Sequence, residues 1–290
     1  MPMITRRNFL NTSLATAALS TARTVPATAQ ANATLKWTVY YANDLPASAF
    51  EDYDLLIFDH AAHPDLTPLK DAGKQVFGYI SLGEVAQDRP YYADIKALGI
   101  LRDENTSWPG SYFIDVRDSR WVKMVIEELV PLVLHRGFDG LFLDTLDNPP
   151  ELERRDPQKN AGMTDSATRL VKALKLHYPK VPLILNRGYE MLPKLAGVVD
   201  YVLGESVFAD YDFTAKTYQR VPTDLYREQV AILKQTQTAT PPPTVLTLDY
   251  WDPADKAGIA AIYAEQRRNG FHPYVATVEL DKLVPEPPAG

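Results

Sequence analysis

Six hydrophobic runs in this chain each end on an acidic residue, and this repeated placement is the pattern most suggestive of chemistry. The six acids are Asp59, Glu84, Asp115, Asp144, Glu205 and Asp249. A carboxylate at the end of a buried strand costs free energy to desolvate, so its repetition indicates strand ends that open onto one polar cavity. We therefore expect the six carboxyl groups to line a single concave face of an enzyme that acts through carboxylates.

Two of these acids, Asp144 and Glu205, are the best candidates for catalysis. Cleavage of a glycosidic bond commonly uses two carboxyl groups, one that donates a proton to the leaving oxygen and one that attacks the sugar or activates water. Beside the second acid, Gly204 would leave room for a ligand to approach the backbone. A single strand-end acid could instead cap a helix or pair with Arg117 or Arg187, but capping alone does not explain six of them.

Aromatic residues near the predicted strand ends favour a sugar ligand. They are Tyr41, Tyr79, Tyr189, Tyr250 and Trp251. At such positions a flat apolar ring can stack on a pyranose, and a hydroxyl group can hydrogen-bond to it. The residues expected to bind substrate are Asp59, Tyr79, Glu84, Asp115, Asp147, Asn186, Arg187, Asp249 and Tyr250.

Other kinds of catalysis fit the sequence poorly. The chain has no cysteine, which excludes thiolate catalysis and a cysteine-based zinc site. His60 and His63 have an H-x-x-H spacing, but they fall in a predicted loop without a further histidine at a nearby strand end. We therefore expect neither a metal nor another cofactor. Ser81 and Ser206 lack the pattern of a nucleophile elbow, so a serine hydrolase is not expected.

Strand and helix signals alternate along the chain, as is typical of a parallel sheet covered by helices. The predicted strands cover residues 37–41, 55–59, 75–82, 140–144, 183–186, 201–204, 245–248 and 274–278. The run before Asp115 is a candidate for an extra strand in the connection between the third and fourth of these. Eight strands favour a (β/α)8 barrel in one domain. The alternative, a doubly wound sheet, lacks support because no glycine-rich phosphate loop follows the first strand.

Apolar stripes with helical spacing predict four of the intervening helices. Three cover about residues 119–136, 164–177 and 218–235. In the fourth, Asp252 is the expected cap, Pro253 takes the first turn and Gly270 ends the helix. The first helix, at residues 47–53, is brief, and the last is barely present after Asp281.

The N-terminus has the features of an export signal. Residues 5–10 form a twin-arginine pattern, a small apolar stretch follows at 14–19, and an A-x-A site ends at Ala29. We expect a twin-arginine signal peptide over residues 1–29, a glycoside hydrolase domain over 30–284 and a disordered, proline-rich tail over 285–290. A protein exported by this route is expected in the periplasm or outside the cell, with no membrane association after the signal is cleaved.

Net charge narrows the range of partners. The full chain has a formal charge of −7. The predicted leader contains three arginines and no acid, so 27 basic and 37 acidic residues remain after cleavage, a balance of −10. Nucleic acid is therefore not an expected partner, whereas an acidic cleft favours a neutral or cationic ligand. A monomer is expected, although the residues themselves leave the oligomeric state open.

Five motifs occur in order along the mature chain. They are Tyr79-Ile80-Ser81-Leu82-Gly83-Glu84, Trp108 with Phe113-Ile114-Asp115-Val116, Gly137-Phe138-Asp139-Gly140-Leu141-Phe142-Leu143-Asp144, Asn186-Arg187-Gly188 and Gly204-Glu205-Ser206. Together they resemble the endo-α-1,4-polygalactosaminidase family, glycoside hydrolase family 114, and its relatives. The resemblance covers about residues 35–283.

This resemblance implies a (β/α)8 barrel that hydrolyses α-1,4-linked, galactosamine-containing polysaccharide, with Asp144 and Glu205 as the catalytic pair. By analogy with retaining α-glycosidases of similar barrel architecture, we expect Asp144 to be the nucleophile and Glu205 the acid/base, in an endo-acting, retaining enzyme. A cationic amino-sugar polymer would also suit the acidic mature chain. Residues 149–163, a loop that should border the cleft, have no match, so subsite specificity is left open.

Two alternatives share much of this pattern. A non-catalytic barrel could use the same acids and aromatic rings to bind a polysaccharide without cutting it. The presence of both Asp144 and Glu205 argues against that, because binding alone requires no opposed pair. A hydrolase of another α-linked glycan would share the mechanism and differ only in its subsites.

Overall fold

The structure is a computed structural model that describes residues 35–288. The expected signal peptide, residues 1–29, lies outside the described residues, as do the last two residues of the expected tail. Among the described helices, none has both the length and the apolar character required to span a membrane.

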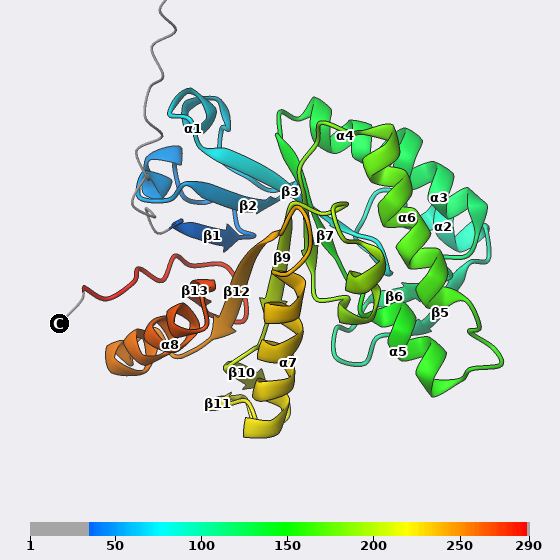
Figure 1. Cartoon of the computed structure of the whole chain (residues 1–290). Helices are drawn as coiled ribbons and strands as arrows, with labels where there is room; N and C mark the ends of the chain where they lie inside the picture. The colour runs from blue at the N-terminus through cyan, green and yellow to red at the C-terminus, as the bar shows by residue number, and fades with distance from the viewer. Residues whose placement is uncertain (1–34, 289–290) are drawn as a thin grey trace, which may run out of the picture. The chain divides into compact units, whose positions relative to one another are not determined.

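Eight parallel strands form the main sheet, in the order β1-β2-β3-β7-β8-β9-β12-β13 (Figure 1). They are β1 (Trp37–Tyr40), β2 (Leu55–Asp59), β3 (Gln75–Ser81), β7 (Gly140–Asp144), β8 (Leu183–Asn186), β9 (Tyr201–Glu205), β12 (Thr244–Tyr250) and β13 (His272–Ala276). Each predicted strand is present with ends within two residues of those expected. The predicted (β/α)8 barrel in a single domain is confirmed.

Side chains of these strands alternate between two apolar layers. One layer fills the barrel and includes Leu55, Phe77, Phe142, Leu203 and Tyr274. The other packs outward against the helices and includes Leu56, Val76, Leu141, Val202 and Val245. Because both faces of such a strand are buried, its sequence is a continuous apolar run that does not show which residues point inward.

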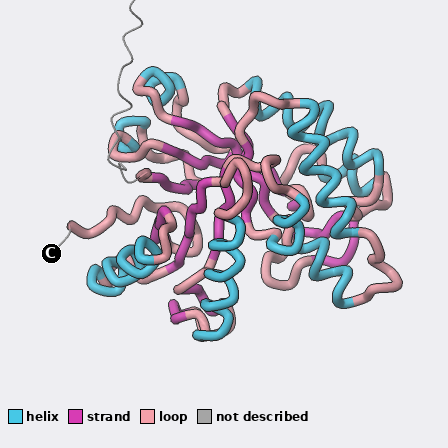
Figure 2. The backbone as a smooth tube through the Cα atoms, in the orientation of Figure 1, coloured by secondary structure: helices cyan, strands magenta, loops and turns pink. Residues whose placement is uncertain are grey.

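Helices surround most of this barrel (Figure 2). A continuous segment comprises α3 (Ser119–Met124), a π-helical stretch (Val125–Leu129) and α4 (Val130–His135), and α6 (Met163–His177), α7 (Thr223–Thr236) and α8 (Lys256–Arg268) follow. The early helices are short, namely a 3-10 turn (Ala47–Phe50) and α1 (Thr67–Asp71), and another 3-10 helix (Tyr189–Lys194) follows β8.

Two predicted helix starts were wrong. The helix expected from residue 218 begins at Thr223, because β11 occupies the preceding residues. The helix expected to be capped by Asp252 begins at Lys256, where the side chain of Asp255 accepts a hydrogen bond from the N–H of Gly258.

Three excursions leave the barrel after the carboxyl ends of its strands. Between β3 and β7, the chain forms β4 (Glu84–Ala86), α2 (Tyr92–Ala97), β5 (Leu101–Glu104) and β6 (Ser111–Ile114), with the strands in a separate antiparallel sheet. The run before Asp115 is thus the anticipated extra strand. After β7 comes α5 (Asn148–Arg155), a helix within the expected loop, and after β9 comes the hairpin of β10 (Ala209–Asp212) and β11 (Thr217–Arg220).

The barrel closes at β1 and β13 through side chains and one loop contact. Within residues 35–288 these two strands share no hydrogen-bonded ladder. Instead the indole Nε1 of Trp37 donates to the carbonyl oxygen of His272 at 2.8 Å, and the Tyr41 N–H donates to Leu280 O at 2.8 Å. The rings of Trp37 and Tyr274, both buried, lie 5.5 Å apart.

The described segment after β13 packs on the barrel beyond this seam. Val284 is buried, and the carboxylate of Glu286 forms an ion pair with the guanidinium of Arg267. Within the described residues no helix follows β13. The segment 285–288, expected to be frayed, is therefore attached at Glu286.

We predict that Trp37→Phe lowers the free energy of unfolding by about 2–3 kcal/mol, because it removes a hydrogen bond and buried volume from the seam. Chemical denaturation would measure this loss. Trp251→Phe is the matched control, since it removes an indole hydrogen bond to Asp255 that is exposed to solvent. Equal effects of the two substitutions would contradict a special role for the seam.

Candidate active site

A cavity of about 1160 Å³ opens at the carboxyl ends of the barrel strands. Inward-facing residues of six strands contribute to its lining: Asp59, Tyr79, Ser81, Asp144, Asn186, Glu205 and Tyr250. Each lies on the same side of its strand as the apolar residues that fill the barrel below, because alternate strand residues share a face. The barrel therefore supports a polar floor on an apolar interior.

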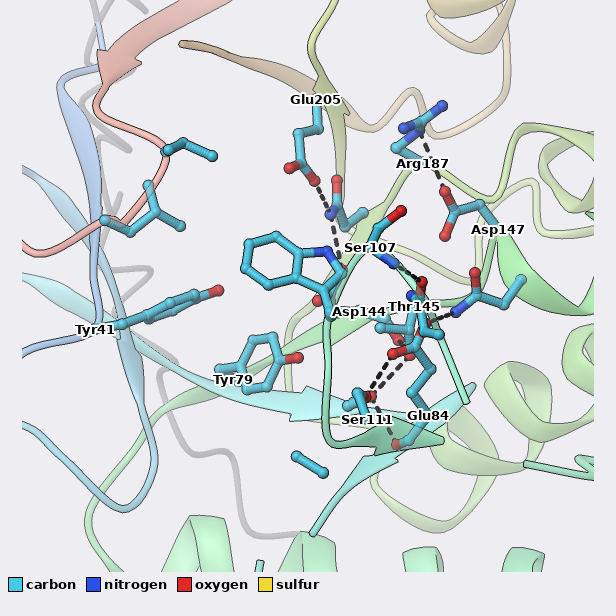
Figure 3. A pocket seen from close by; sticks show the side chains of 18 of the residues that line it. Tyr41, Tyr79, Glu84, Ser107, Ser111, Asp144, Thr145, Asp147, Arg187 and Glu205 are labelled. Carbon is cyan, nitrogen blue, oxygen red and sulfur yellow. Dashed lines mark hydrogen bonds and ion pairs between the residues drawn. The ribbon is translucent and has the colours of Figure 1, made fainter. Parts of the chain in front are cut away.

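The central feature of this floor is one amide that joins two carboxylates. Nδ2 of Asn186 donates to Oδ1 of Asp144 at 2.8 Å and to Oε2 of Glu205 at 2.6 Å. The two accepting oxygens can be no farther apart than the sum of these distances, 5.4 Å. The three residues are the last ones of β7, β8 and β9, which are neighbours in the sheet. Figure 3 labels Asp144 and Glu205 among the side chains that line the cavity.

The backbone turns sharply directly after each of these residues. Thr145, Arg187 and Ser206 all adopt the left-handed region, with φ of 63°, 51° and 53°. For residues other than glycine such a conformation costs about 1–3 kcal/mol and is concentrated at functional sites. Local contacts hold it in place: the hydroxyl of Thr145 accepts from the N–H of Gly83 at 2.8 Å, and Ser206 donates through its N–H to Leu248 O at 2.8 Å.

Tyrosines provide neutral donors beside the carboxylates. The hydroxyl of Tyr250 donates to Oε1 of Glu205 at 2.6 Å. Burial raises the pKa of Tyr250 and of Tyr79 well above the ordinary value, and the negative charges of Glu205 and Asp144, respectively, raise it further. Both phenols therefore stay protonated at all physiological pH values. Tyr41 lies against Tyr79, with ring centroids 5.1 Å apart.

Electrostatics make the two carboxylates a coupled pair. Burial, followed by the negative charge of Glu205, raises the pKa of Asp144 to about 7. Two carboxylates this close repel each other when both are ionised, and this repulsion favours the protonated form of Asp144. The amide oxygen Oδ1 of Asn186 is buried and has no hydrogen-bond partner among the described residues. It is an acceptor available to a ligand.

Cations near the pair are already held by other acids. Two nitrogens of Arg89 bind the carboxylate of Asp59 at 3.2 and 2.6 Å. Burial alone would raise the pKa of Asp59, but the hydrogen bonds and charge of Arg89 outweigh it and lower the pKa. Nε of Arg187 lies 3.4 Å from Oδ2 of Asp147, and both side chains line the main cavity and also a second one of about 260 Å³.

Glu84 lines the cavity, but its oxygens are occupied by protein donors. Oε1 accepts from the side-chain amides of Asn105 at 2.7 Å and Asn148 at 2.6 Å, and Oε2 accepts from the hydroxyl of Ser111 at 2.6 Å. These donors come from both ends of the β5–β6 turn and from the first residue of α5. Glu84, the first residue of β4, thus joins the β5–β6 turn to α5.

The prediction that all six acids line one face was wrong for Asp249 and Asp115. Asp249 has no exposed surface and faces the helices, because β12 continues to Tyr250 and neighbouring strand residues point to opposite sides. Burial raises its pKa to about 6. Asp115 lies after the outlying strand β6, paired with Arg102 and Arg117. The structure places the other four acids at the cavity.

Gly204 also differs from its expected role. A side chain there would meet Val207 at 2.7 Å and Leu233 of α7 at 2.8 Å. The glycine is therefore needed for close packing between β9 and α7, rather than for the approach of a ligand.

The two histidines of the H-x-x-H spacing each lie beside a backbone carbonyl oxygen. Nδ1 of His60 lies 2.7 Å from Tyr79 O, and Nδ1 of His63 lies 2.8 Å from Pro64 O. Across residues 35–288, no group of three or more potential ligands from His, Cys, Asp and Glu was found.

The excursions add lining residues that sequence reasoning did not assign to the site. Among them are Trp108, Glu151, Tyr211 and Phe213. A sequence signal does exist for Trp108, an aromatic residue in the polar turn that ends in Pro109-Gly110. No sequence signal indicates which aromatic residue of the β10–β11 hairpin reaches the cavity, since that depends on how the hairpin packs against the barrel.

Comparisons with known proteins agree with this architecture. The glycoside hydrolase domain of PelA from Pseudomonas aeruginosa is 27% identical, covering 86% of this chain and 96% of that one with a TM-score of 0.75. Ega3 of Aspergillus fumigatus, solved in complex with galactosamine, is 17% identical over 87% of this chain and 94% of that one, with a TM-score of 0.65, and it shares the fold.

A curated relative and a family model complete the comparison. An uncharacterized protein of Methanocaldococcus jannaschii is 30% identical over 125 residues, which is 38% of this chain and about a third (36%) of that protein. The model of glycoside-hydrolase family GH114 matches residues 14–288, nearly the whole sequence. The chain therefore belongs to glycoside hydrolase family GH114.

Proposed function

We propose that this protein is a retaining, endo-acting glycoside hydrolase that cleaves α-1,4-linked, galactosamine-containing polysaccharide, with Asp144 and Glu205 as the catalytic pair. The observation that carries the proposal is the single amide of Asn186 that binds both carboxylates. Its two hydrogen bonds keep Oδ1 of Asp144 and Oε2 of Glu205 at most 5.4 Å apart. Retaining enzymes have carboxyl groups about 5–5.5 Å apart, whereas inverting enzymes need about 6.5–9.5 Å to admit a water.

In the proposed reaction, an oxygen of Asp144 bonds to the anomeric carbon as the bond from that carbon to the leaving oxygen breaks. Glu205 gives its proton to the leaving oxygen. Water then attacks the anomeric carbon, Glu205 takes up the proton of that water, and Asp144 is released. Each cycle returns one proton to the pair and consumes one water.

The free enzyme holds this proton on a buried pair in which the pKa of Asp144 is raised. The proposed roles require the proton to be on Glu205 when the glycan is bound. Such a transfer leaves the total charge of the pair unchanged. Trapping the covalent intermediate and identifying the modified carboxylate would distinguish these roles from the reverse assignment.

Charge around the cavity supports a cationic sugar. Its lining contains nine acidic and four basic residues, so the potential favours an amine over a carboxylate on the substrate. The complex of Ega3 with galactosamine is consistent with that choice. Export by the twin-arginine route, to the periplasm or the cell exterior, is part of this proposal because an extracellular polysaccharide must be reached.

We predict that Asp144→Asn and Glu205→Gln each reduce hydrolysis of partially deacetylated galactosaminan by at least about 10³-fold, because each keeps the shape but removes the charge or the proton needed for chemistry. A reducing-end assay measures the loss, and NMR of the first product should show the anomeric configuration of the substrate.

Asp115→Asn is the matched control for this experiment. Asp115 also follows an apolar strand, but it lies outside the cavity, so its variant should keep turnover within about threefold of wild type. Near-normal hydrolysis by either catalytic variant would remove that residue from the mechanism. A product with inverted anomeric configuration would exclude Asp144 as the nucleophile. Binding of the polymer by the wild type without any cleavage would favour the non-catalytic barrel.

We further predict that Asp144→Asn stabilises the fold at neutral pH while it abolishes turnover. The folded pKa of Asp144 is raised to about 7 from an ordinary value of 3.8, so the wild type loses stability as pH rises through that interval. The variant has no charge at this position, so it does not lose this stability as pH rises. The melting temperature of the variant should exceed that of wild type by an amount that grows from pH 4 to 7. At pH 7 the gain in free energy of unfolding should be about 0.5–2 kcal/mol. A difference that does not vary with pH would contradict the raised pKa of Asp144.

A further inference from the structure

Two exposed aromatic side chains meet at the cavity, and the catalytic proposal does not use them. Trp108 is 52% exposed and Phe213 is 46% exposed, and both line the cavity. Their ring centroids lie 5.2 Å apart in an edge-to-face contact. Of the large apolar side chains that are exposed within residues 35–288, only these two are aromatic. Single exposed apolar residues are common, but an exposed aromatic pair at a cleft indicates a binding surface.

The two rings belong to different excursions, so their contact spans the site. Trp108 lies in the β5–β6 turn, which belongs to the excursion after β3, and Phe213 lies in the β10–β11 turn, which follows β9. In the barrel, β7 and β8 stand between β3 and β9. These two intervening strands end on Asp144 and Asn186. The aromatic pair therefore connects the excursions on either side of the proposed catalytic centre.

The turn that carries Trp108 is held by acidic side chains. Glu84 binds Asn105 and Ser111, the residues at its two ends, as described above. In addition, the carboxylate of Glu104 accepts from the N–H of Gly110 at 2.6 Å. The ring of Trp108 is thus exposed on a turn whose backbone is fixed, which lowers the entropy lost when a ligand stacks on it.

A second buried carboxylate holds the hairpin that carries Phe213. Oδ1 of Asp249 accepts from the backbone N–H groups of Phe208 and Ala209 at 2.6 and 2.8 Å. The guanidinium of Arg220 lies between two rings, 4.3 Å from that of Phe208 and 4.5 Å from that of Trp251. These contacts fix both strands of the hairpin to the barrel.

The aromatic surface continues along the hairpin. The ring of Tyr211, which also lines the cavity, lies 5.3 Å from that of Phe213 and 5.1 Å from that of Tyr218. Aromatic faces bind the apolar faces of sugar rings, and a row of them fits several consecutive sugars better than one. A contact between two rings is worth only about 0.5–1.5 kcal/mol, so it can be exchanged for contacts with a ligand.

The geometry points to Trp108 and Phe213 as a polymer-binding pair that stacks on sugars beyond the cleaved bond and holds the chain across the catalytic centre. This inference rests on the proposed function for the identity of the glycan. It assigns the pair to recognition of a long chain, with no part in proton transfer or nucleophilic attack. Asp249 and Glu84 act as positioning residues for the two turns.

The test compares kinetics on partially N-acetylated α-1,4-galactosaminan. Trp108→Ala and Phe213→Ala should each raise KM at least tenfold, equivalent to about 1.4 kcal/mol, while kcat at saturating polymer stays within threefold. Trp108→Phe retains an aromatic face and should recover most of the lost affinity. Leu225→Ala is the matched control, because Leu225 is 53% exposed on α7 and does not line the cavity.

A KM within twofold of wild type in both alanine variants would overturn the inference, and so would a failure of Trp108→Phe to recover affinity. Calorimetric titration of the same polymer separates this outcome from failure of the proposed function. If the wild type binds the polymer without cutting it and the alanine variants bind tenfold more weakly, the aromatic pair stands and the catalytic proposal falls. If the wild type does not bind the polymer, the inference is wrong.

Discussion

The repulsion between two carboxylates beside one amide is the constraint on which the rest of the site depends. Asp144 and Glu205 are held together by Asn186, and two negative charges so close at a buried site repel each other. A cation between them would remove this repulsion, which is part of the cause of the raised pKa of Asp144. The structure instead surrounds the pair with neutral donors, while Arg89 and Arg187 are held by acids of their own.

The strands form the floor of the cavity, and the excursions form its walls. The strands bring the last residues of β7, β8 and β9 side by side, and the left-handed turn after each one directs the chain away from the floor. The strain of those turns is offset by the rigid barrel beneath them. The excursions then form the walls, and buried acids hold two of them in place: Glu84 of β4 holds the β5–β6 turn of its own excursion, and Asp249 of β12 holds the hairpin.

Much of the architecture could be predicted because it follows from local signals. The eight strands are continuous apolar runs, and their carboxyl ends must share one face of a parallel barrel. On this basis Asp144, Glu205, Asp59 and Glu84 were expected at the cavity, and they lie there. Asp249 was expected there as well but points away, since the sequence of a strand buried on both faces does not show the direction of each side chain. Nor does the sequence distinguish an acid that contacts a ligand from one that holds a turn.

The sequence by itself determined the barrel and the family, and it identified Asp144 and Glu205 as the candidate pair, because apolar runs and short motifs are properties of contiguous residues. Only the tertiary structure decided that Asn186 joins this pair, that Asp249 points toward the helices, and that Trp108 meets Phe213. These contacts link residues that are 17 to 105 positions apart. Their geometry is set by strand register and by the docking of excursions, neither of which is encoded in any single segment of the chain.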